Sequence, residues 1–220
     1  MTDSPTGLRE RKRQRTYRAI SDAAISLFLE KGFDAVSVSE IAEAAEVSKP
    51  TLFRYFAAKE DMALYRFADH EDEAARVVAA RGAGVAPLTA LEEHFLAGLA
   101  ARDPATGLSD DPEVLAFHRL LYGTPSLLAR LHSYTARSEE ALTSQLAEVP
   151  PAARKRPGEP DRMLTARLAA GQIVTTQRVL ATENWRRVAQ GASAESQYAP
   201  ARAAAVHAFA LLRTGLTPYA

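Results

Sequence analysis

The chain contains no cysteine among its 220 residues. This absence excludes disulfide bonds, thiolate ligands for zinc and a cysteine nucleophile, and it fits a reducing compartment. No stretch approaches the roughly 18 consecutive apolar residues that a membrane-spanning helix needs. The N-terminus is polar and basic and lacks the apolar segment of a secretion signal. We therefore expect a cytoplasmic protein.

Motifs of catalysis are also scarce. The five histidines include no H-E-x-x-H pair, and the sequence has neither a glycine-rich phosphate loop nor a G-x-S-x-G element. The stretches "HEDE" (70–73) and "EEH" (92–94) offer carboxylate and imidazole groups, but consecutive residues on a helix point in different directions, which favours solvated faces. We expect no catalytic residue, no metal and no cofactor, and a helical enzyme is the less favoured alternative.

Charge is distributed unevenly, although the chain carries 27 acidic and 27 basic residues. Residues 1–18 hold six Arg or Lys side chains against Asp3 and Glu10, a net charge of +4, so the remainder sums to −4. A basic arm on a mildly acidic body has two interpretations, a solvated N-terminus or a segment that contacts nucleic acid.

Hydrophobic spacing predicts an all-α protein. Apolar residues at helical intervals run from Tyr17 to Phe28, and Gly32 ends that pattern. Ser37 and Glu40 form a capping-box pattern at the start of a second helix. The break before residue 60 separates an N-terminal domain (1–59) from a second domain (60–220). Further helices are expected near 60–81, 88–102, 113–122, 126–148, 161–190 and 199–215.

The stretch "SKPTLFRYF" (48–56) combines apolar and polar side chains in one short helix. Ser48 caps this third helix, and Pro50 fits its first turn because the missing N–H has no helical partner there. Val47, Leu52 and Phe56 are expected to anchor the helix on the first two. A helix-turn-helix that enters the DNA major groove would present the opposite set: Lys49, Thr51, Arg54 and Tyr55.

Residues 18–62, with the motifs "AAISLFLEKGF", "SVSEIAEAA", "VSKPTLFRYF" and "KED", resemble the DNA-binding domain of the tetracycline-repressor (TetR) family. The resemblance implies an all-helical homodimer. It implies an N-terminal three-helix helix-turn-helix domain and a variable C-terminal domain that binds a small molecule, usually in repression. The segment "RLLYGTPSLLARLHSYTARSEEAL" resembles actinobacterial regulators grouped with the mycofactocin regulator, for which acyl-CoA ligands are known.

The resemblance assigns DNA contacts to the start of the second helix, to the third helix and to the start of the fourth. Arg54 is the candidate for guanine readout because its planar guanidinium matches O6 and N7. Two arginines of the basic arm would reach a minor groove or phosphates. The full predicted set is Arg13, Arg15, Ser37, Ser39, Lys49, Thr51, Arg54, Tyr55 and Lys59.

Three residues depart from the family pattern. Phe53 replaces a common Tyr and lacks a hydroxyl for phosphate, so we expect it to pack against sugar or protein. Glu46 stands where Gly is common in the turn, which costs on the order of 1 kcal/mol if the residue has a positive φ. Ala58 replaces the usual Ser or Asn cap of the next helix, a loss of roughly 1 kcal/mol.

The second domain is expected to bind a small apolar or amphipathic effector between its helices. His118 and Tyr122 are four residues apart and share one helical face. An aromatic residue at helical spacing also has the plainer role of a core residue. The candidate lining residues are aromatic or polar groups on largely apolar faces: Phe95, Phe117, His118, Tyr122, His132, Tyr134 and Trp185.

The last two helices carry many small residues beside Leu, Ile and Val, in "LTARLAAGQIVTTQRVLAT" and "AAAVHAFALLRTGL". Small side chains let helices approach closely, and an apolar face needs a partner. This pair is therefore the predicted homodimer surface, with packing inside one chain as the alternative.

These features together predict a transcriptional regulator, a ligand-released repressor that binds a palindromic operator in double-stranded DNA as a homodimer. A nucleoid-type protein that binds DNA without sequence preference is one alternative. The near-neutral body argues against it, because such binding relies on a broad positive surface. The helical enzyme is the other alternative.

Overall fold

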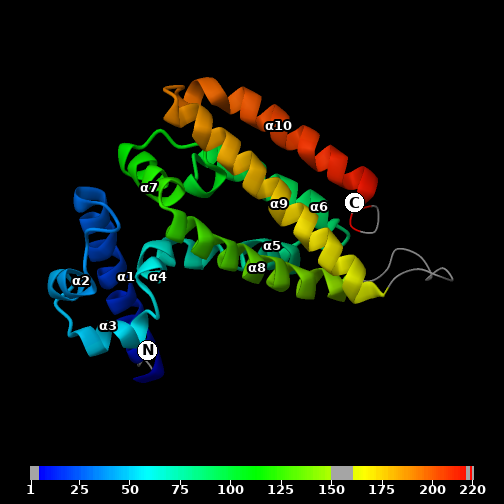
Figure 1. Ribbon diagram of the computed structural model, residues 1–220. Coiled ribbons are helices and arrows are strands. Elements are labelled where there is room, and N and C mark those ends of the chain that lie inside the picture. The colour runs from blue at the N-terminus through cyan, green and yellow to red at the C-terminus, as the bar shows by residue number, and fades with distance from the viewer. Residues whose placement is uncertain (1–4, 150–160, 217–218, 220) are drawn as a thin grey trace. The chain divides into compact units, whose positions relative to one another are not determined.

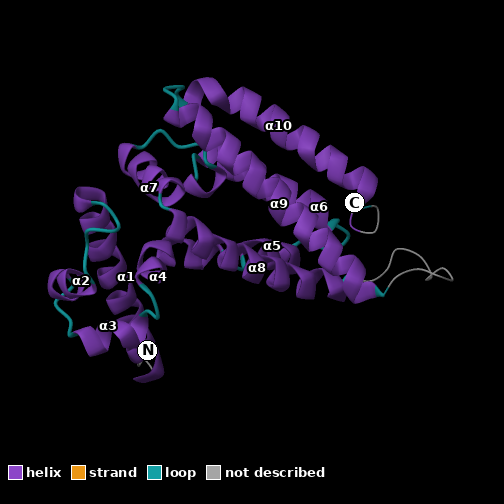
Figure 2. Cartoon of the chain, in the orientation of Figure 1, coloured by secondary structure: helices purple, strands orange, loops and turns teal. Residues whose placement is uncertain are grey.

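The structure, a computed structural model, describes residues 5–149, 161–216 and 219, and this part contains helices and no strand (Figures 1 and 2). The all-α prediction is confirmed. Each helix in the described ranges is either too short or too polar to span a lipid bilayer. The helices are α1 (Pro5–Lys31), α2 (Val38–Ala44), α3 (Lys49–Tyr55), α4 (Lys59–Leu64), the 3-10 helix η1 (Tyr65–His70), α5 (Glu73–Ala80), α6 (Pro87–Ala101), the 3-10 helix η2 (Pro104–Thr106), α7 (Pro112–Gly123), α8 (Pro125–Glu148), α9 (Arg162–Ala189) and α10 (Ala194–Gly215).

The prediction of one helix over 60–81 is wrong. The chain there forms α4, η1 and α5, with a turn at Glu71 and Asp72. Negative side chains are favoured at a helix N-terminus, and three successive acidic residues stand where α5 begins. Asp72 Oδ1 accepts a hydrogen bond from Arg76 Nε, one turn along, at 2.8 Å. The acidic run therefore starts a new helix instead of extending the previous one.

The basic arm is helical in the part that the structure describes. α1 begins at Pro5 and continues for 27 residues, and Pro is compatible with a first helical turn. Arg11, Lys12, Arg13 and Arg15 are exposed along this helix. The first four residues of the predicted arm lie outside the described ranges.

The fold divides into two compact units, and unit 1 contains the chain up to residue 69 together with residues 116–132. Its buried core includes Phe28 from α1, Ile41 from α2, Leu52 from α3 and Met62 from α4. Ser21 Oγ donates to the backbone oxygen of Met62 at 2.7 Å, so a buried hydroxyl also ties α1 to α4. The division expected before residue 60 falls inside this unit.

Unit 2 contains residues 70–115 and the chain from residue 133 onward. α10 packs against α6 and α9, and α5 packs against α6 (Figure 1). The core of this unit includes Leu91 and Phe95 of α6, Ile173 of α9 and Phe209 of α10. α7 and α8 each contribute residues to both units.

The segment around η2 approaches the backbone of α9 very closely. Gly107 has a φ of 72°, and a Cβ added to it would lie 1.9 Å from the backbone oxygen of Ala181. The buried Asn184 Nδ2 donates to the backbone oxygen of Thr106 at 2.9 Å, which fixes the same contact. Only glycine fits position 107 for both reasons, its positive φ and its lack of a side chain.

Gly107→Ala should therefore lower the free energy of unfolding by about 3 kcal/mol, because it adds steric overlap to backbone strain. Urea unfolding of both proteins measures the difference. Gly123→Ala is the matched control: this glycine ends α7, and an added Cβ there meets nothing within 4 Å. An equal effect of the two substitutions would contradict the close approach at η2.

Candidate nucleic-acid interface

The start of α2 is held by a reciprocal pair of hydrogen bonds. The Ser37 N–H donates to Glu40 Oε2 at 2.8 Å, and the Glu40 N–H donates to Ser37 Oγ at 3.3 Å. The predicted capping box is therefore confirmed. Ser37 and Ser39 are both exposed at this end of the helix, where the resemblance assigns phosphate contacts.

The turn between α2 and α3 contains a strained residue. Glu46 has a φ of 53°, a left-handed conformation that is unfavourable for a residue with a side chain. The conformational cost on the order of 1 kcal/mol that was expected for a positive φ at this position therefore applies. The Val47 N–H donates to the backbone oxygen of Ala42 at 2.9 Å, which closes the turn.

α3 begins at the predicted cap. The Thr51 N–H donates to Ser48 Oγ at 3.2 Å, and the two hydroxyl oxygens lie 2.8 Å apart. At the other end, the Phe56 N–H donates to the backbone oxygen of Leu52 at 3.0 Å. Leu52 and Phe56 are buried, so they anchor the helix as expected.

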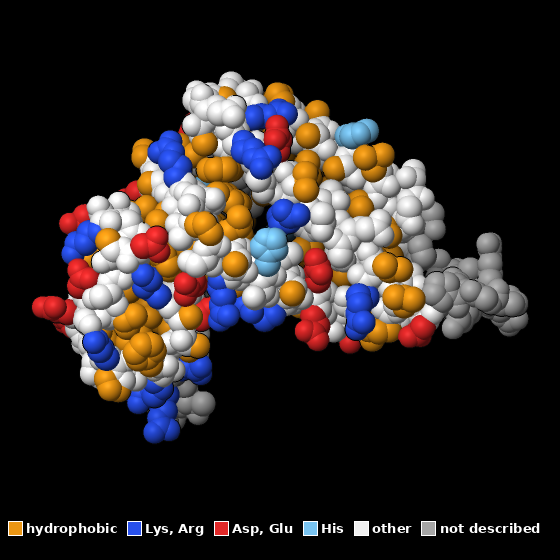
Figure 3. All heavy atoms as spheres, in the orientation of Figure 1, with side chains coloured by type: hydrophobic (Ala, Val, Ile, Leu, Met, Phe, Trp, Pro, Cys, Tyr) orange, Lys and Arg blue, Asp and Glu red, His pale blue; other side chains and the backbone are white. Residues whose placement is uncertain are grey.

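The other side of α3 faces outward. Lys49 and Arg54 are exposed, while Thr51 and Tyr55 are half-buried. Phe53 is 54% exposed, so the protein does not cover it; the expected packing against protein is wrong, and packing against a sugar stays a prediction. Figure 3 shows basic side chains around an apolar patch over α3 and near the N-terminal end of α1.

An aromatic cluster around Tyr17 fixes the position of Tyr55. The rings of Tyr17 and Tyr55 meet edge to face at 4.8 Å, and the rings of Tyr17 and Tyr65 stack at 5.2 Å. Arg13 Cζ lies 5.5 Å from the centre of the Tyr17 ring. The sequence identified Tyr17 only as an apolar position in a helix, whereas the structure shows that it joins the basic arm to α3.

Lys59, predicted to contact the DNA backbone, already has partners within unit 1. Its Nζ donates to the backbone oxygens of Phe33 at 2.7 Å and of Val36 at 3.1 Å, and it lies 4.2 Å from the centre of the Phe33 ring. An ammonium group has three N–H donors. Two are used here, so a phosphate contact through the third stays a prediction.

Ala58 gives the first-turn N–H groups of α4 no side-chain cap, but the side chain of Asp61 binds the backbone of Ala58 itself. The Ala58 N–H donates to Asp61 Oδ2 at 3.1 Å. Arg130 of α8 donates two hydrogen bonds to the same carboxylate, from Nε to Oδ1 at 2.7 Å and from Nη2 to Oδ2 at 2.9 Å. Sequence reasoning missed Arg130 because the pair is 69 residues apart and no local pattern links them.

The predicted effector-lining residues fall in both units. In unit 1, Phe117 and His118 are buried, and burial lowers the pKa of His118 to about 4, so its ring is neutral at pH 7. In unit 2, Phe95 belongs to the core. Their role as effector contacts stays a prediction for the whole set: Phe117, His118, Tyr122 and His132 in unit 1, and Phe95, Tyr134 and Trp185 in unit 2.

The acidic and histidine stretches singled out in the sequence meet in unit 2. Glu73 accepts from His70 Nδ1 at 2.8 Å and lies 3.0 Å from His94 Nε2. The pKa of Glu73 is lowered, first by the hydrogen bond from His70. These side chains are thus not merely solvated, because the Glu73 carboxylate joins η1, α5 and α6. Within the described residues no group of three or more His, Asp or Glu side chains is arranged to hold a metal ion.

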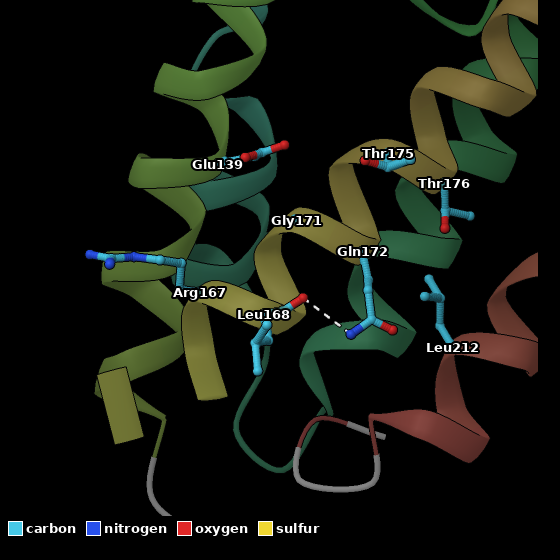
Figure 4. Close-up of a pocket in the computed structure, with 8 residues that line it drawn as sticks. All are labelled: Glu139, Arg167, Leu168, Gly171, Gln172, Thr175, Thr176 and Leu212. Carbon is cyan, nitrogen blue, oxygen red and sulfur yellow. Dashed lines mark hydrogen bonds between the residues drawn. The ribbon is translucent and has the colours of Figure 1, made fainter. Parts of the chain in front are cut away.

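A surface groove of about 520 Å³ lies over α9 (Figure 4). Gln172 Nε2 donates within it to the backbone oxygen of Leu168 at 3.2 Å. None of the predicted effector residues lines this groove. The lining residues are Arg167, Leu168, Gly171, Gln172, Thr175 and Thr176 of α9, Glu139 of α8 and Leu212 of α10.

Known proteins share the N-terminal pattern. Residues 20–65 match the family model "Bacterial regulatory proteins, tetR family". The chain is 38% identical over 149 residues to the HTH-type transcriptional regulator TcmR of Streptomyces glaucescens, which covers 67% of this chain and 64% of that protein. It is also 47% identical over 60 residues to MftR of Mycobacterium tuberculosis, a regulator assigned to mycofactocin biosynthesis. That match covers 27% of this chain and 30% of MftR. These matches span less than two thirds of the length of each relative.

Solved structures share the fold along most of the chain. NalD of Pseudomonas aeruginosa, the secondary repressor of the MexAB-OprM multidrug efflux pump, is 18% identical with a TM-score of 0.53, over 89% of this chain and 97% of that chain. FadR of Bacillus subtilis, solved with stearoyl-CoA, is 19% identical with a TM-score of 0.52, over 87% and 98%. At these identities the likeness shows the fold alone.

The capping box at the start of α2 should survive strong acid. The Ser37 N–H first, and then Lys31 Nζ at 3.0 Å, hold the pKa of Glu40 at about 2, against an ordinary value of 4.5. A depressed pKa in the folded state contributes stability that is present above about pH 4.5 and is lost as the pH falls through about 2. NMR titration of the Glu40 carboxyl should give a midpoint near 2, and Lys31→Met should raise it. A midpoint near 4.5 in the unmodified chain would show that the box is open.

Proposed function

We propose that this chain, which belongs to the TetR family of bacterial transcriptional regulators through its residues 20–65, binds a specific operator and represses transcription from it. One observation carries the proposal. α3 is a short helix with a capped N-terminus and a buried apolar side, and its outer side presents an arginine, a lysine and an aromatic ring. That combination suits a rigid recognition helix in the DNA major groove.

The side chains of this interface divide into two roles. Arg54 would read guanine through paired hydrogen bonds to O6 and N7, with Lys49 and Thr51 near bases or phosphates at the N-terminal end of α3. Phosphate contacts carry affinity but no sequence information. That second role belongs to Ser37, Ser39, Tyr55, Lys59, Arg13 and Arg15.

A homodimer through α9 and α10 would present two such helices. Apolar side chains lie exposed on both helices: Leu164 at 48%, Leu168 at 56% and Val179 at 53% on α9, and Leu211 at 60% on α10. An apolar surface of this kind marks an association site. Two-fold symmetry of the protein then requires a palindromic operator with half-sites one or more helical turns apart.

Regulation requires a second ligand, which we propose is a small apolar or amphipathic molecule. It would release the DNA by favouring a dimer in which the two α3 helices no longer match successive major grooves. The candidate element that transmits the effect of the ligand is α8, because its residues 125–132 belong to unit 1 and its remaining turns belong to unit 2. The bidentate Arg130–Asp61 pair connects this helix to the start of α4.

The test is a titration of the purified chain into labelled DNA that flanks its own gene, with unrelated DNA as competitor, at two salt concentrations. Binding that resists the competitor and protects a palindrome supports a sequence-specific dimer. Equal loss to specific and unrelated DNA, together with a steep salt dependence, would instead favour a protein that grips phosphates without reading bases.

Arg54→Ala and Tyr55→Ala should have different effects on DNA binding. Loss of Arg54 should mainly relax sequence preference, by about tenfold per half-site, because the guanine contact is lost. Loss of Tyr55 should weaken binding to all sequences by about tenfold. Tyr55→Phe keeps the ring against Tyr17 and so separates the hydroxyl from the packing. Competition titrations with operator and random duplexes measure both effects, and equal losses on both duplexes for Arg54→Ala would remove it from base readout.

Arg130→Met should weaken operator binding about fivefold, because the Asp61 carboxylate at the start of α4 loses its bidentate partner. Asp61→Asn should do the same, and the double variant should lose no more than either single variant. Arg137→Met is the matched control: it breaks a 2.8 Å pair with Glu71 inside unit 2 and should leave the operator affinity unchanged. Additive losses, or an equal loss in the control, would show that the pair acts only on overall stability.

A further inference from the structure

Phe53 is a large apolar side chain that unit 1 leaves in solvent. It is 54% exposed, while its neighbour Leu52 is fully buried and Phe56 is 4% exposed. Among the exposed large hydrophobic side chains in the described ranges, Phe53 is the only aromatic one. The fold therefore gains little from its ring, and a partner that covers it would gain the burial.

The geometry of α3 places this ring within the outward arc. Successive residues turn by about 100° around a helix, so Phe53 lies about 80° from the middle of the side that Leu52 and Phe56 bury, on one flank of the helix. Phe53 follows Lys49 by four residues and shares its flank. Tyr55 lies on the other flank, where Tyr17 holds its ring at 4.8 Å. The two aromatic rings thus have different surroundings, one fixed against α1 and one open.

The chemistry of the ring restricts what it can recognise on DNA. A phenyl group has no hydrogen-bond donor or acceptor, so it cannot pair with the N7, O6, O4 or amino groups of the base edges. The apolar feature that a base presents in the major groove is the 5-methyl group of thymine. A deoxyribose also offers apolar surface, but every nucleotide carries one, so a sugar contact gives no sequence preference.

We propose that Phe53 is a specificity-determining residue that reads thymine through its 5-methyl group, beside the base contacts of Arg54. This assignment rests on the proposed function, since it requires α3 to enter the major groove of an operator. It predicts that each half-site contains one thymine whose methyl group contributes to binding and whose contribution depends on the Phe53 ring.

The experiment removes the methyl group and the ring in turn. The probe is the duplex that the unmodified full-length chain selects from a random pool, with each thymine replaced singly by deoxyuridine in both half-sites. For the unmodified chain, one such replacement should weaken binding about fourfold per half-site, the factor for burying one methyl group. For Phe53→Ala, the same replacement should change the affinity less than twofold, because the methyl group has lost its partner.

Two controls separate this effect from damage to the fold. Phe53→Ala should unfold at the same temperature as the unmodified chain, because the side chain is exposed. Leu29→Ala removes another exposed apolar side chain, 40% exposed on α1, and should retain the full sensitivity to deoxyuridine.

Each remaining outcome overturns the inference in a recognisable way. A duplex that is selected but is insensitive to deoxyuridine at every thymine leaves the proposed function standing and rejects thymine readout. Sensitivity that persists in Phe53→Ala assigns the methyl contact to another residue. Failure of the unmodified chain to select any duplex removes the proposed function and this inference together.

Discussion

The packing of a seven-residue helix against its neighbours is the constraint on which the rest of unit 1 depends. An isolated helix of that length is unstable in water, so α3 persists because Leu52 and Phe56 are buried and because Ser48 caps its N-terminus. The outer side chains have defined directions only while this anchoring holds. Tyr17 adds a second restraint, since its ring contacts the rings of both Tyr55 and Phe56.

The start of α4 is a second junction, built from charge. Lys59 reaches back to the carbonyl groups of Phe33 and Val36, between α1 and α2. Asp61, two residues later, caps the Ala58 N–H and binds Arg130 of α8. Oppositely charged side chains on one short helix thus hold two different segments of unit 1. α4 lacks a side-chain cap of its own, and these contacts with residues distant in the sequence hold it in place.

The parts of this structure that the sequence predicted depend on residues close together in the chain. The capping box at Ser37 and the cap at Ser48 follow from patterns within a few positions, and the positive φ at Glu46 meets the condition that the family resemblance raised for that turn. The all-α fold follows from hydrophobic spacing, which is also local. These features need no knowledge of what the rest of the chain does.

The features that the sequence did not predict come from distant or competing interactions. Arg130 meets Asp61 across 69 residues, and Lys59 meets Phe33 across 26. The break at 71–72 reflects a competition, in which apolar spacing favoured continuation and the acidic run favoured a new start. Phe53 was expected to find either a protein or a sugar neighbour, and only the folded arrangement shows that the protein provides none.

The distribution of aromatic residues has an optical consequence. Trp185 is the single tryptophan of the chain, and it lies half-buried in α9 of unit 2. Tyr17, Tyr55 and Tyr65 form an aromatic cluster in unit 1, in which Tyr17 stacks on Tyr65 and meets Tyr55 edge to face. Light at the red edge of the protein absorption band excites tryptophan and not tyrosine, so emission from the unmodified chain comes from unit 2 alone. Any change in that emission when DNA meets α3 would record, without a label, a signal that has travelled from one unit to the other.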